Sequence, residues 1–437
     1  MKSLKRLILV LLAFAAAHLA NAQTPAPAQK GRILLLGGTA HLGTGDKIEG
    51  AAVGFENGII TFVGSEKNVT PAEWDEVIDT HEKHIYPGFI APNSQLGLME
   101  IEAVRATKDY AEVGTFKPHI RSAIAFNTDS EITPTVRSNG VLMGQITPAG
   151  GTISGTSSIM QFDAWNWEDA IVVEGDGIHL NWPLVYHKHR QDGQVNIQKI
   201  KTYEQQLQEI QSYFQQAQAY AKLNSETVDV RMEAMKGLWD GTLALYVHAD
   251  DVQQITEAVA LKKQFGIARM VIVGGYDSHL VADMLRDNEV AVMVRRTHTL
   301  PRYAEDDVDL PFKLPKLLED EGVLYCLENS GSMSEMGTRN LPFLAGTAVA
   351  YGLTYEQGVK AITYNTARIL GIADRLGSIE KGKEATLIVS DGDALDMRTN
   401  HISHAWINGR TIDLDNRQEQ LYRKYESKYK REGTLEE

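Results

Sequence analysis

The stretch LALYVHADDVQQITEAVALKKQFGIARMVIVGGYDSHLVADMLRDNEVAVMV, Leu243 to Val294, decides the fold. It contains three short apolar runs separated by two amphipathic stretches. Such alternation predicts strand–helix units and therefore a parallel β-sheet. We expect strands at Leu243–Val247, Met270–Val273 and Val290–Val294, with helices at Asp251–Phe265 and His279–Asn288 between them.

The same rhythm extends outward over much of the chain. Further apolar runs predict strands at Val141–Ile146, Ser158–Phe162, Ile178–Leu180 and Val323–Leu327. Apolar residues at three- and four-residue spacing predict helices at Lys199–Leu223 and Pro311–Glu321. The segment GGTISGTSS, Gly150–Ser158, is rich in glycine and hydroxyls, and we expect it to be a flexible loop. For the basic run His187–Arg190, a surface loop is favoured over a transition-metal clip.

Both ends of the chain have a different pattern. Residues 32–64, and the chain from Leu376 onward, carry short β-like runs with turns at Asn57-Gly58 and Asn408-Gly409. We expect the two ends to pair into one small sandwich, and residues 416–437 to form a charged terminal helix. The fold class expected is therefore α/β.

The first 30 residues are typical of an export signal and a linker. Lys2, Lys5 and Arg6 precede the apolar run Leu7–Ala17, and the small residues at 20–22 form a cleavage site. This predicts a signal peptide at 1–22, a Pro/Ala linker at 23–30, and a periplasmic or secreted protein without a membrane anchor. The formal net charge of −14 repels phosphate backbones, so nucleic-acid binding is not expected.

Two segments together resemble the amidohydrolase superfamily, near its imidazolonepropionase-like and prolidase-like branch. They are YPGFIAPNSQLGL at Tyr86–Leu98 and the long block at Gly352–Leu395, which resembles the last barrel helix and the return to the small sandwich. The resemblance implies a (β/α)₈ TIM barrel at 89–375 and a composite β-sandwich at 31–88 and 376–415. It also implies a metal-dependent hydrolase of non-peptide C–N bonds.

The metal ligands that the resemblance implies are mostly replaced. Asn93 and Gln95 stand at the His-x-His positions, whereas His248 matches the family's strand-5 histidine. Gly274 or Gly275 takes the place of a strand-6 histidine, and Glu328, Asn329 or Ser330 the place of the strand-8 aspartate. His248 alone does not make a zinc site, which needs three or four protein ligands. A divalent metal is expected of the family, but no metal is assigned here.

Each candidate site residue has two interpretations. Glu328 and His248 are the candidate catalytic pair; otherwise Glu328 pairs with a basic neighbour (Arg295, Arg296 or Arg339), and His248 is a core residue. Asn93 and Gln95 bind a ligand or a hard cation, or they form a polar plug. Arg296 and His298 alternate onto one face if their strand continues that far, where they would hold a substrate carboxylate; otherwise they lie in a solvated loop. The last candidate ligand-binding residue is Asn329.

Two functions from different classes follow. The first is a hydrolase acting on cyclic amides or small peptide-like compounds with a degenerate metal site. The second is an inactive paralogue that binds a small ligand or assembles with an active amidohydrolase, as a homodimer or a heteromer.

Overall fold

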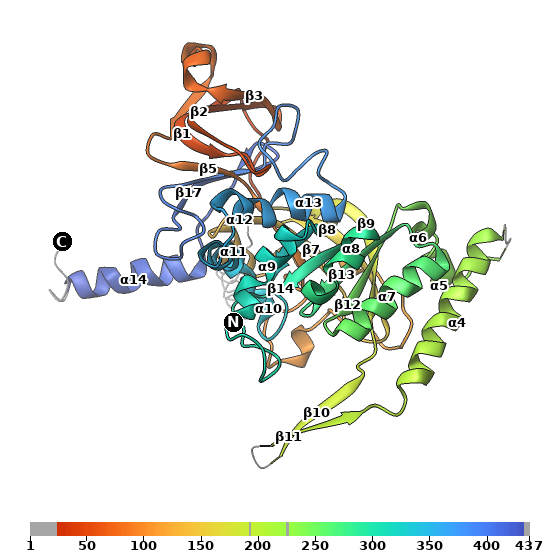
Figure 1. The fold of residues 1–437 in the computed structure, drawn as a ribbon. Helices are drawn as coiled ribbons and strands as arrows, with labels where there is room; N and C mark the ends of the chain where they lie inside the picture. Colours follow the sequence, from red (N-terminus) through yellow and green to blue (C-terminus); the bar gives the residue numbers. More distant parts are fainter. Residues whose placement is uncertain (1–23, 192–193, 224–226, 432–437) are drawn as a thin grey trace, which may run out of the picture.

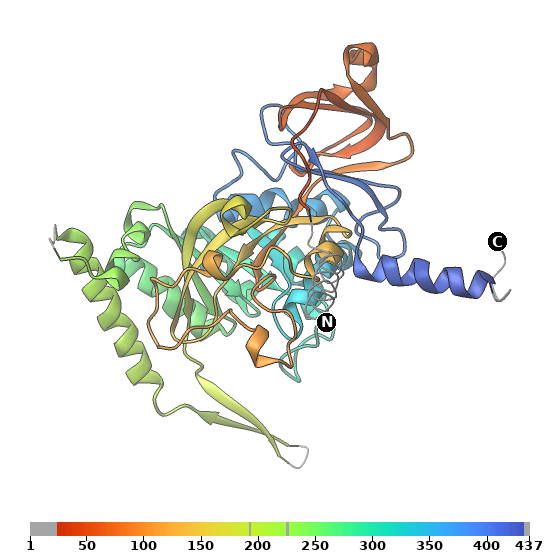
Figure 2. The same cartoon turned by 180° about the vertical axis from the view of Figure 1, so that it is seen from behind.

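The structure is a computed structural model that describes residues 24–191, 194–223 and 227–431. Figure 1 shows a barrel with a smaller β-sheet beside it. A long hairpin, β10 (Tyr186–Gln191) with β11 (Gln194–Lys199), projects from the barrel. Figure 2 shows from behind that the terminal helix α14 (Arg417–Arg431) also extends away from the body.

The small sheet is built from both ends of the described chain. Its order is β18-β17-β16-β5-β1-β2-β3, with β4 also pairing with β1. The strands are β1 (Ile33–His41), β2 (Lys47–Glu56), β3 (Ile59–Ser65), β4 (Glu76–Asp79), β5 (His84–Pro87), β16 (Leu387–Ser390), β17 (Ile402–Ile407) and β18 (Arg410–Thr411). The two ends meet where β16 pairs antiparallel with β5. Asn57 and Asn408 have φ of 49° in the two tight turns, a conformation that asparagine tolerates.

The barrel is an eight-stranded sheet, which confirms the predicted fold class. In order around the barrel its strands are β6 (Phe89–Ser94), β7 (Val141–Ile146), β8 (Ile153–Gln161), β9 (Ile171–Asn181), β12 (Ala244–Ala249), β13 (Arg269–Gly274), β14 (Val290–Arg295) and β15 (Tyr325–Glu328). Adjacent strands are parallel, except that β8 runs antiparallel to both neighbours. Within the described chain β15 and β6 form no ladder; the Ile90 amide donates instead to the Ile362 carbonyl at 3.0 Å.

The predicted flexible loop at Gly150–Ser158 is wrong, because most of it belongs to strand β8. Glycine and small hydroxyl side chains suit this strand because the segment that contains Pro118 and Ile120 passes very close to it. A Cβ on Gly155 would lie 2.5 Å from the Ile120 carbonyl oxygen. The Thr156 hydroxyl donates to the Pro118 carbonyl at 2.7 Å, so it is satisfied inside the protein. The run His187–Arg190 is also not a loop; it lies in strand β10.

Helices cover the outside of the barrel. The predicted helices after β12 and β14 are α7 (Val252–Phe265) and α9 (Leu310–Asp320), while the one after β13 is a short turn followed by α8 (Ala282–Asp287). The predicted helix at 199–223 is α4 (Tyr203–Lys222); it begins later because Lys199 ends β11. The remaining helices are α2 (Thr133–Arg137), α3 (Trp167–Ala170), α5 (Val230–Glu233), α6 (Gly237–Asp240), α10 (Ser334–Gly337), α11 (Leu341–Ala350), α12 (Tyr355–Ala361) and α13 (Tyr364–Leu370).

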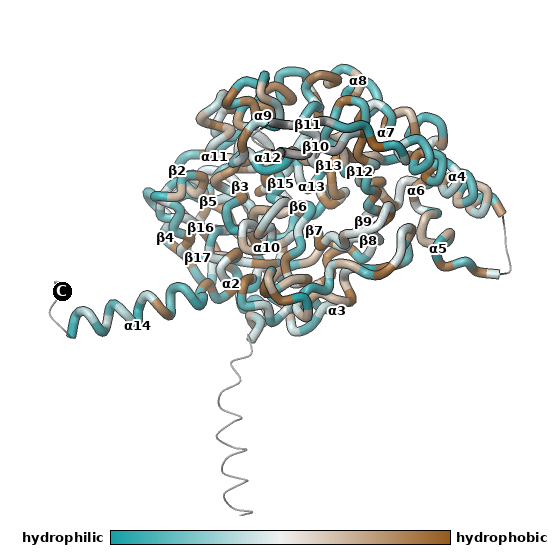
Figure 3. The backbone as a smooth tube through the Cα atoms, turned by 90° about the horizontal axis from the view of Figure 1, so that it is seen from below, coloured by the Kyte–Doolittle hydropathy of each residue, from teal (hydrophilic) through white to brown (hydrophobic). Residues whose placement is uncertain are grey.

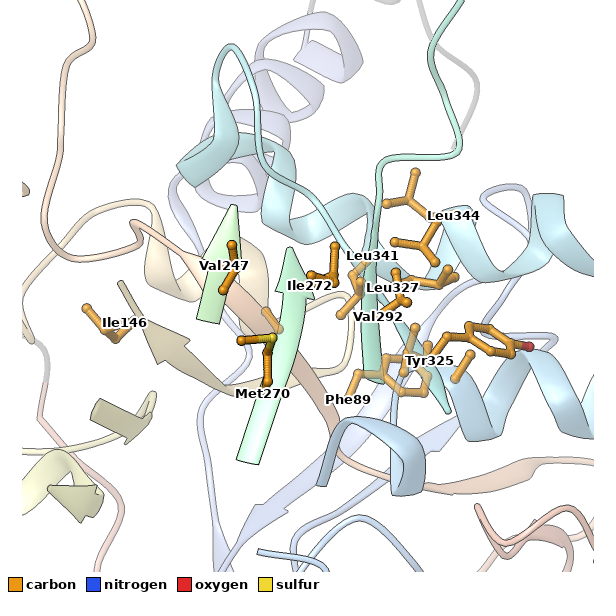
Figure 4. Packing of buried hydrophobic residues seen from close by; sticks show 14 of the residues in the cluster. Phe89, Ile146, Val247, Met270, Ile272, Val292, Tyr325, Leu327, Leu341 and Leu344 are labelled. Carbon is orange, nitrogen blue, oxygen red and sulfur yellow. The ribbon is translucent and has the colours of Figure 1, made fainter. Parts of the chain in front are cut away.

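Strand alternation creates two cores. Val247, Val292 and Leu327 point outward and pack with Leu341 and Leu344 of α11 in one buried cluster (Figure 4). Residues one position away point inward, and a second cluster fills the barrel interior with Met143, Ile159, Tyr246, Val273, Met293 and Cys326. Figure 3 shows hydrophobic residues along the barrel strands, whereas α14 is mostly hydrophilic. Among the described residues, no helix has the length and apolarity needed to cross a bilayer.

A buried ion cluster ties the chain ends to the barrel. The Asp163 carboxylate accepts from Arg137 at 2.9 Å, from Arg410 of β18 at 2.8 Å, and from the Ala26 amide at 2.9 Å. The side chains of Arg137 and Asp163 are only 6% and 5% exposed. One carboxylate thus holds the start of the described chain, the last strand of the small sheet and the barrel together.

Candidate functional site

The site lies where the parallel strands of the barrel end. On β12, Tyr246 belongs to the barrel interior, and alternation places His248 above it on the same face. In the same way Met293 is followed by Arg295 on β14, and Cys326 by Glu328 on β15, with Arg295 and Glu328 directly opposite each other. The C-terminal ends of barrel strands therefore bring His248, Arg295 and Glu328 to one mouth, the usual place of function in this architecture.

Glu328 is a fully buried carboxylate whose two oxygens are both hydrogen-bonded. The Ser330 hydroxyl donates to Oε1 at 2.7 Å and the Ser330 amide donates to Oε2. Arg295 Nε lies 3.9 Å from Oε1, so of the basic neighbours considered, Arg295 is the ion partner. Burial raises the pKa of the Glu328 carboxyl, opposed by Arg295 and by the hydrogen bonds from Ser330 and Asn93. A carboxyl whose pKa is raised by burial is a candidate general acid or base.

Asn93 joins Glu328 to the barrel interior. Its Nδ2 donates to Glu328 Oε2 at 3.4 Å, and its backbone amide donates to Gln145 Oε1 at 3.0 Å. Asn93 has a φ of 49°, and β6 ends one residue later at Ser94. Gln95 therefore follows the strand rather than sharing a strand face with Asn93, and it is only partly buried.

His248 bonds to a second histidine rather than to Glu328. Its Nε2 lies 2.9 Å from Nδ1 of His179 on β9, and burial with the nearby Arg295 lowers the pKa of His248 to about 4. His179 is fully buried and stacks on Tyr246 at 4.8 Å between ring centroids. Burial, followed by the neighbouring His248, lowers the pKa of His179 well below its usual value. The two imidazoles are therefore a neutral pair at neutral pH.

Behind the histidines lies a buried carboxylate, Asp176. It accepts from the Ser157 hydroxyl at 2.7 Å, from Gln145 Nε2 at 2.6 Å and from the Tyr246 hydroxyl at 2.7 Å. The Ser157 oxygen also lies 2.9 Å from Nε2 of His179. Burial raises the pKa of Asp176, against these three hydrogen bonds. A continuous polar network thus runs through the barrel from Glu328 to His248.

Arg296 and His298 do not share a strand face, because β14 ends at Arg295, and both lie in the loop that was the alternative interpretation. Arg296 Nη2 donates to the carbonyls of Ser332 at 3.1 Å and Asn329 at 3.4 Å. His298 bonds at 2.6 Å to the Thr347 hydroxyl of α11. The two side chains therefore contact different elements, the turn after β15 and helix α11. Asn329 is buried and donates to the Ser334 carbonyl at 3.3 Å, which orders the turn after β15.

A small cavity of about 80 Å³ adjoins the mouth. Asp250 follows β12 and lies 3.0 Å from Arg295 and 3.1 Å from Arg302. Tyr276 and Leu300 also line this cavity. Arg295 therefore lies between two carboxylates, Asp250 and Glu328, and it is 45% exposed, so it can turn toward a ligand.

The donors at this mouth do not fit the divalent metal that the resemblance implies. His248 directs Nε2 to His179, Asn93 presents its amide nitrogen to Glu328, and Gly274 ends β13 where a histidine is expected. No group of three His, Cys, Asp or Glu side chains in the described part of the chain is placed to hold an ion. Catalytic zinc usually needs three protein ligands.

Sequence reasoning missed four residues of this network, namely Gln145, Ser157, Asp176 and His179. One signal was present: His179 lies between Ile178 and Leu180 in a predicted strand, so alternation points it into the barrel. Asp176 carried no such signal, because its partners come from three other strands.

Comparison with known proteins gives a consistent result. Residues 234–412 match the model of the amidohydrolase family. Imidazolonepropionase of Bacillus cereus (strain ATCC 10987 / NRS 248) is 23% identical over 389 residues, covering 83% of this chain and 89% of that protein. Imidazolonepropionase of Bacillus mycoides (strain KBAB4) is 22% identical over the same shares.

Solved structures agree on the fold. An amidohydrolase from Thermotoga maritima MSB8 superposes with a TM-score of 0.75 at 24% identity, covering 87% of this chain and 99% of that one. A Xaa-Pro dipeptidase with bound methionine gives a TM-score of 0.53 at 15% identity, covering 87% and 100%.

Proposed function

Because this chain belongs to the amidohydrolase superfamily, we propose that it hydrolyses an amide-type C–N bond of a small compound at the barrel mouth. The proposed substrates are cyclic amides or small peptide-like compounds, the two kinds that its imidazolonepropionase and dipeptidase relatives suggest. The observation that carries the proposal is the fully buried Glu328, whose pKa is raised, at the end of β15 beside a cationic group.

The proposed reaction uses Glu328 for both proton transfers. The ionised carboxylate takes a proton from water as the water oxygen attacks the carbonyl carbon. Arg295 turns from Glu328 to stabilise the negative charge that develops on the carbonyl oxygen. Protonated Glu328 then donates to the leaving nitrogen as the C–N bond breaks. The products are a carboxylic acid and an amine, and Glu328 returns to its starting state.

One observation favours the second candidate, an inactive paralogue that binds a ligand or pairs with an active amidohydrolase. Asn93 and Ser330 satisfy both oxygens of Glu328 within the protein, so the carboxylate is fully partnered without a substrate. A satisfied buried network rigidifies a core, as a polar plug does. Such a protein would still bind a small compound, or a second amidohydrolase chain, at the same mouth.

Glu328→Gln decides between these functions. The glutamine keeps the shape of the side chain but cannot transfer the proton, so we expect kcat to fall at least about 100-fold. The measurement is hydrolysis of a panel of lactams, hydantoins and Xaa-Pro dipeptides, together with equilibrium binding of the same compounds. His298→Gln is the matched control, because His298 contacts α11 rather than Glu328, and it should retain activity.

Each outcome has a definite meaning. Turnover that is lost in Glu328→Gln, with binding retained, supports hydrolysis. Binding without turnover in the unaltered protein supports the inactive paralogue. Hydrolysis that depends on stoichiometric zinc and is lost in His248→Ala would overturn the metal-free mechanism.

We also propose that the protein is exported to the periplasm or beyond, after cleavage near Ala22. The segment that carries this proposal, residues 1–22, lies outside the described residues. N-terminal sequencing of protein recovered from each cell compartment tests it, and an intact Met1 on that protein would contradict it.

A further inference from the structure

Four side chains form a hydrogen-bonded relay from the barrel interior to its mouth. The relay runs from Asp176 through Ser157 and His179 to His248, with successive distances of 2.7, 2.9 and 2.9 Å. Its first three members are almost completely buried, whereas His248 is partly exposed. The relay thus connects a carboxylate sealed in the barrel to an imidazole that a ligand can reach.

The chemistry of the donors gives the relay a direction. Both oxygens of Asp176 accept hydrogen bonds, Oδ2 from Gln145 and Tyr246, and Oδ1 from Ser157. The Ser157 hydroxyl has one proton and gives it to Asp176, so its oxygen must accept from His179 Nε2–H. Nδ1 of His179 is then an acceptor, and His248 must fill it with its own Nε2–H.

We infer that this relay holds His248 in its Nε2–H tautomer and directs the bare Nδ1 lone pair toward the mouth as a hydrogen-bond acceptor. In this inference His248 is the last member of the hydrogen-bonded relay and not a metal ligand. Asp176, Ser157 and His179 are positioning residues, since they act only through His248. The ligand group that Nδ1 accepts is an N–H or O–H donor. Only this ligand contact rests on the proposed function; the tautomer does not.

The charged neighbours of the relay are few. The charge of Arg295 of β14 acts on His248. The charge of Arg269 of β13 acts on Tyr246, which donates a hydrogen bond to Asp176. Neither guanidinium can accept a proton from the relay, because arginine stays protonated. The direction of the relay is thus set by Asp176.

Asp176→Asn is the decisive variant. At Oδ2 two donors converge, so the asparagine oxygen should take that position and its NH₂ group should face Ser157. Ser157 would then accept from Asn and donate to His179 Nε2, which places the remaining proton on His179 Nδ1. His179 would donate to His248 Nε2, and the proton of His248 would move to Nδ1. A single buried substitution is thus expected to reverse the tautomer of His248.

The measurement is the ¹⁵N spectrum of the histidine side chains in the full chain at neutral pH, without ligand. His248→Gln and His179→Gln identify the two signals. We expect Nε2–H for His248 in the unaltered protein and Nδ1–H in Asp176→Asn. Tyr246→Phe is the matched control: it removes another partner of Asp176 but leaves the relay intact, so the tautomer should not change.

Ser157→Ala provides a second test, since it interrupts the relay with a small change of volume. In that background the preference for Nε2–H should be lost, and adding Asp176→Asn should have no further effect. An unchanged His248 tautomer in both Asp176→Asn and Ser157→Ala would overturn the inference. So would a shift of the His248 signals on addition of Zn²⁺ that reports metal bound to its nitrogen. Loss of turnover alone would leave it standing, because no substrate enters these measurements.

Discussion

Asp163→Ala is expected to lower the free energy of unfolding by about 3–5 kcal/mol, the usual cost of removing one partner from a buried ion pair. The variant leaves Arg137 in a site where its side chain is 6% exposed, and it leaves Arg410 and the Ala26 amide without their shared acceptor. The cost comes chiefly from keeping a positive charge buried beside the removed carboxylate, rather than from the lost attraction itself. Urea unfolding followed by circular dichroism measures it.

Asp283→Ala is the matched control. Asp283 also pairs with an arginine, Arg286 at 2.7 Å, but its side chain is 78% exposed. An exposed pair of this kind contributes about 0–1 kcal/mol. If Asp163→Ala cost no more than Asp283→Ala, the carboxylate would not be what holds the chain ends to the barrel.

The second large effect is expected on acidification. In the unfolded chain His248 binds a proton near its ordinary pKa of 6.5, but in the folded protein only near about 4. The unfolded state thus binds more protons between these values, so stability is full above 6.5 and is lost as the pH falls to about 4. The loss from His248 is on the order of 3 kcal/mol. His179, whose pKa is also lowered, adds to it.

Carboxyls with raised pKa values act in the opposite sense. Glu328 and Asp176 bind protons more readily in the folded state, so acidification stabilises the fold through them. The effect of His248 is therefore measured as the difference between the unaltered protein and His248→Gln, by urea unfolding at neutral pH and near pH 4. That difference should shrink as the pH falls. A difference that stays constant would contradict the lowered pKa of His248.

Most of the fold could be predicted from the sequence, because the barrel strands are short apolar runs that are mostly separated by helices. The prediction for Val141–Ile146 matches β7 at both ends. The strand predicted at 270–273 is one residue shorter than β13 at each end, and the one at 290–294 is one residue shorter than β14 at its C-terminal end. The predicted strand at Ser158–Phe162 covers only the end of β8, and the first part of β8 was missed for a physical reason. Its glycines and hydroxyls are typical of turns, and only the packing of Ile120 and Pro118 against the strand explains their place in a sheet.

The sequence predicted those site residues that lie at the ends of barrel strands. It did not predict the contacts that depend on how side chains from several strands meet inside the barrel. Strand ends brought His248 and Glu328 to the same mouth, as expected of a barrel. The direct partners of these residues, Asn93 and Arg295, were among those considered from the sequence. The direction of Asn93, however, follows from its positive φ, and the separation of Arg296 from His298 follows from where β14 stops. Neither feature has a local sequence signal.

The pairing of β5 with β16 leaves one edge of the small sheet uncovered while the rest of the chain is being synthesised. Leu387 of β16 pairs with Pro87 of β5, and these positions are 300 residues apart. At about 5–20 residues per second, a ribosome needs roughly 15–60 seconds to make the intervening chain. During that time strands β1 to β5 are complete, but the edge of β5 that β16 will cover has no partner. An open strand edge is a template for pairing with other chains. The newborn protein is therefore most exposed to aggregation through its earliest strands, long after they have left the ribosome.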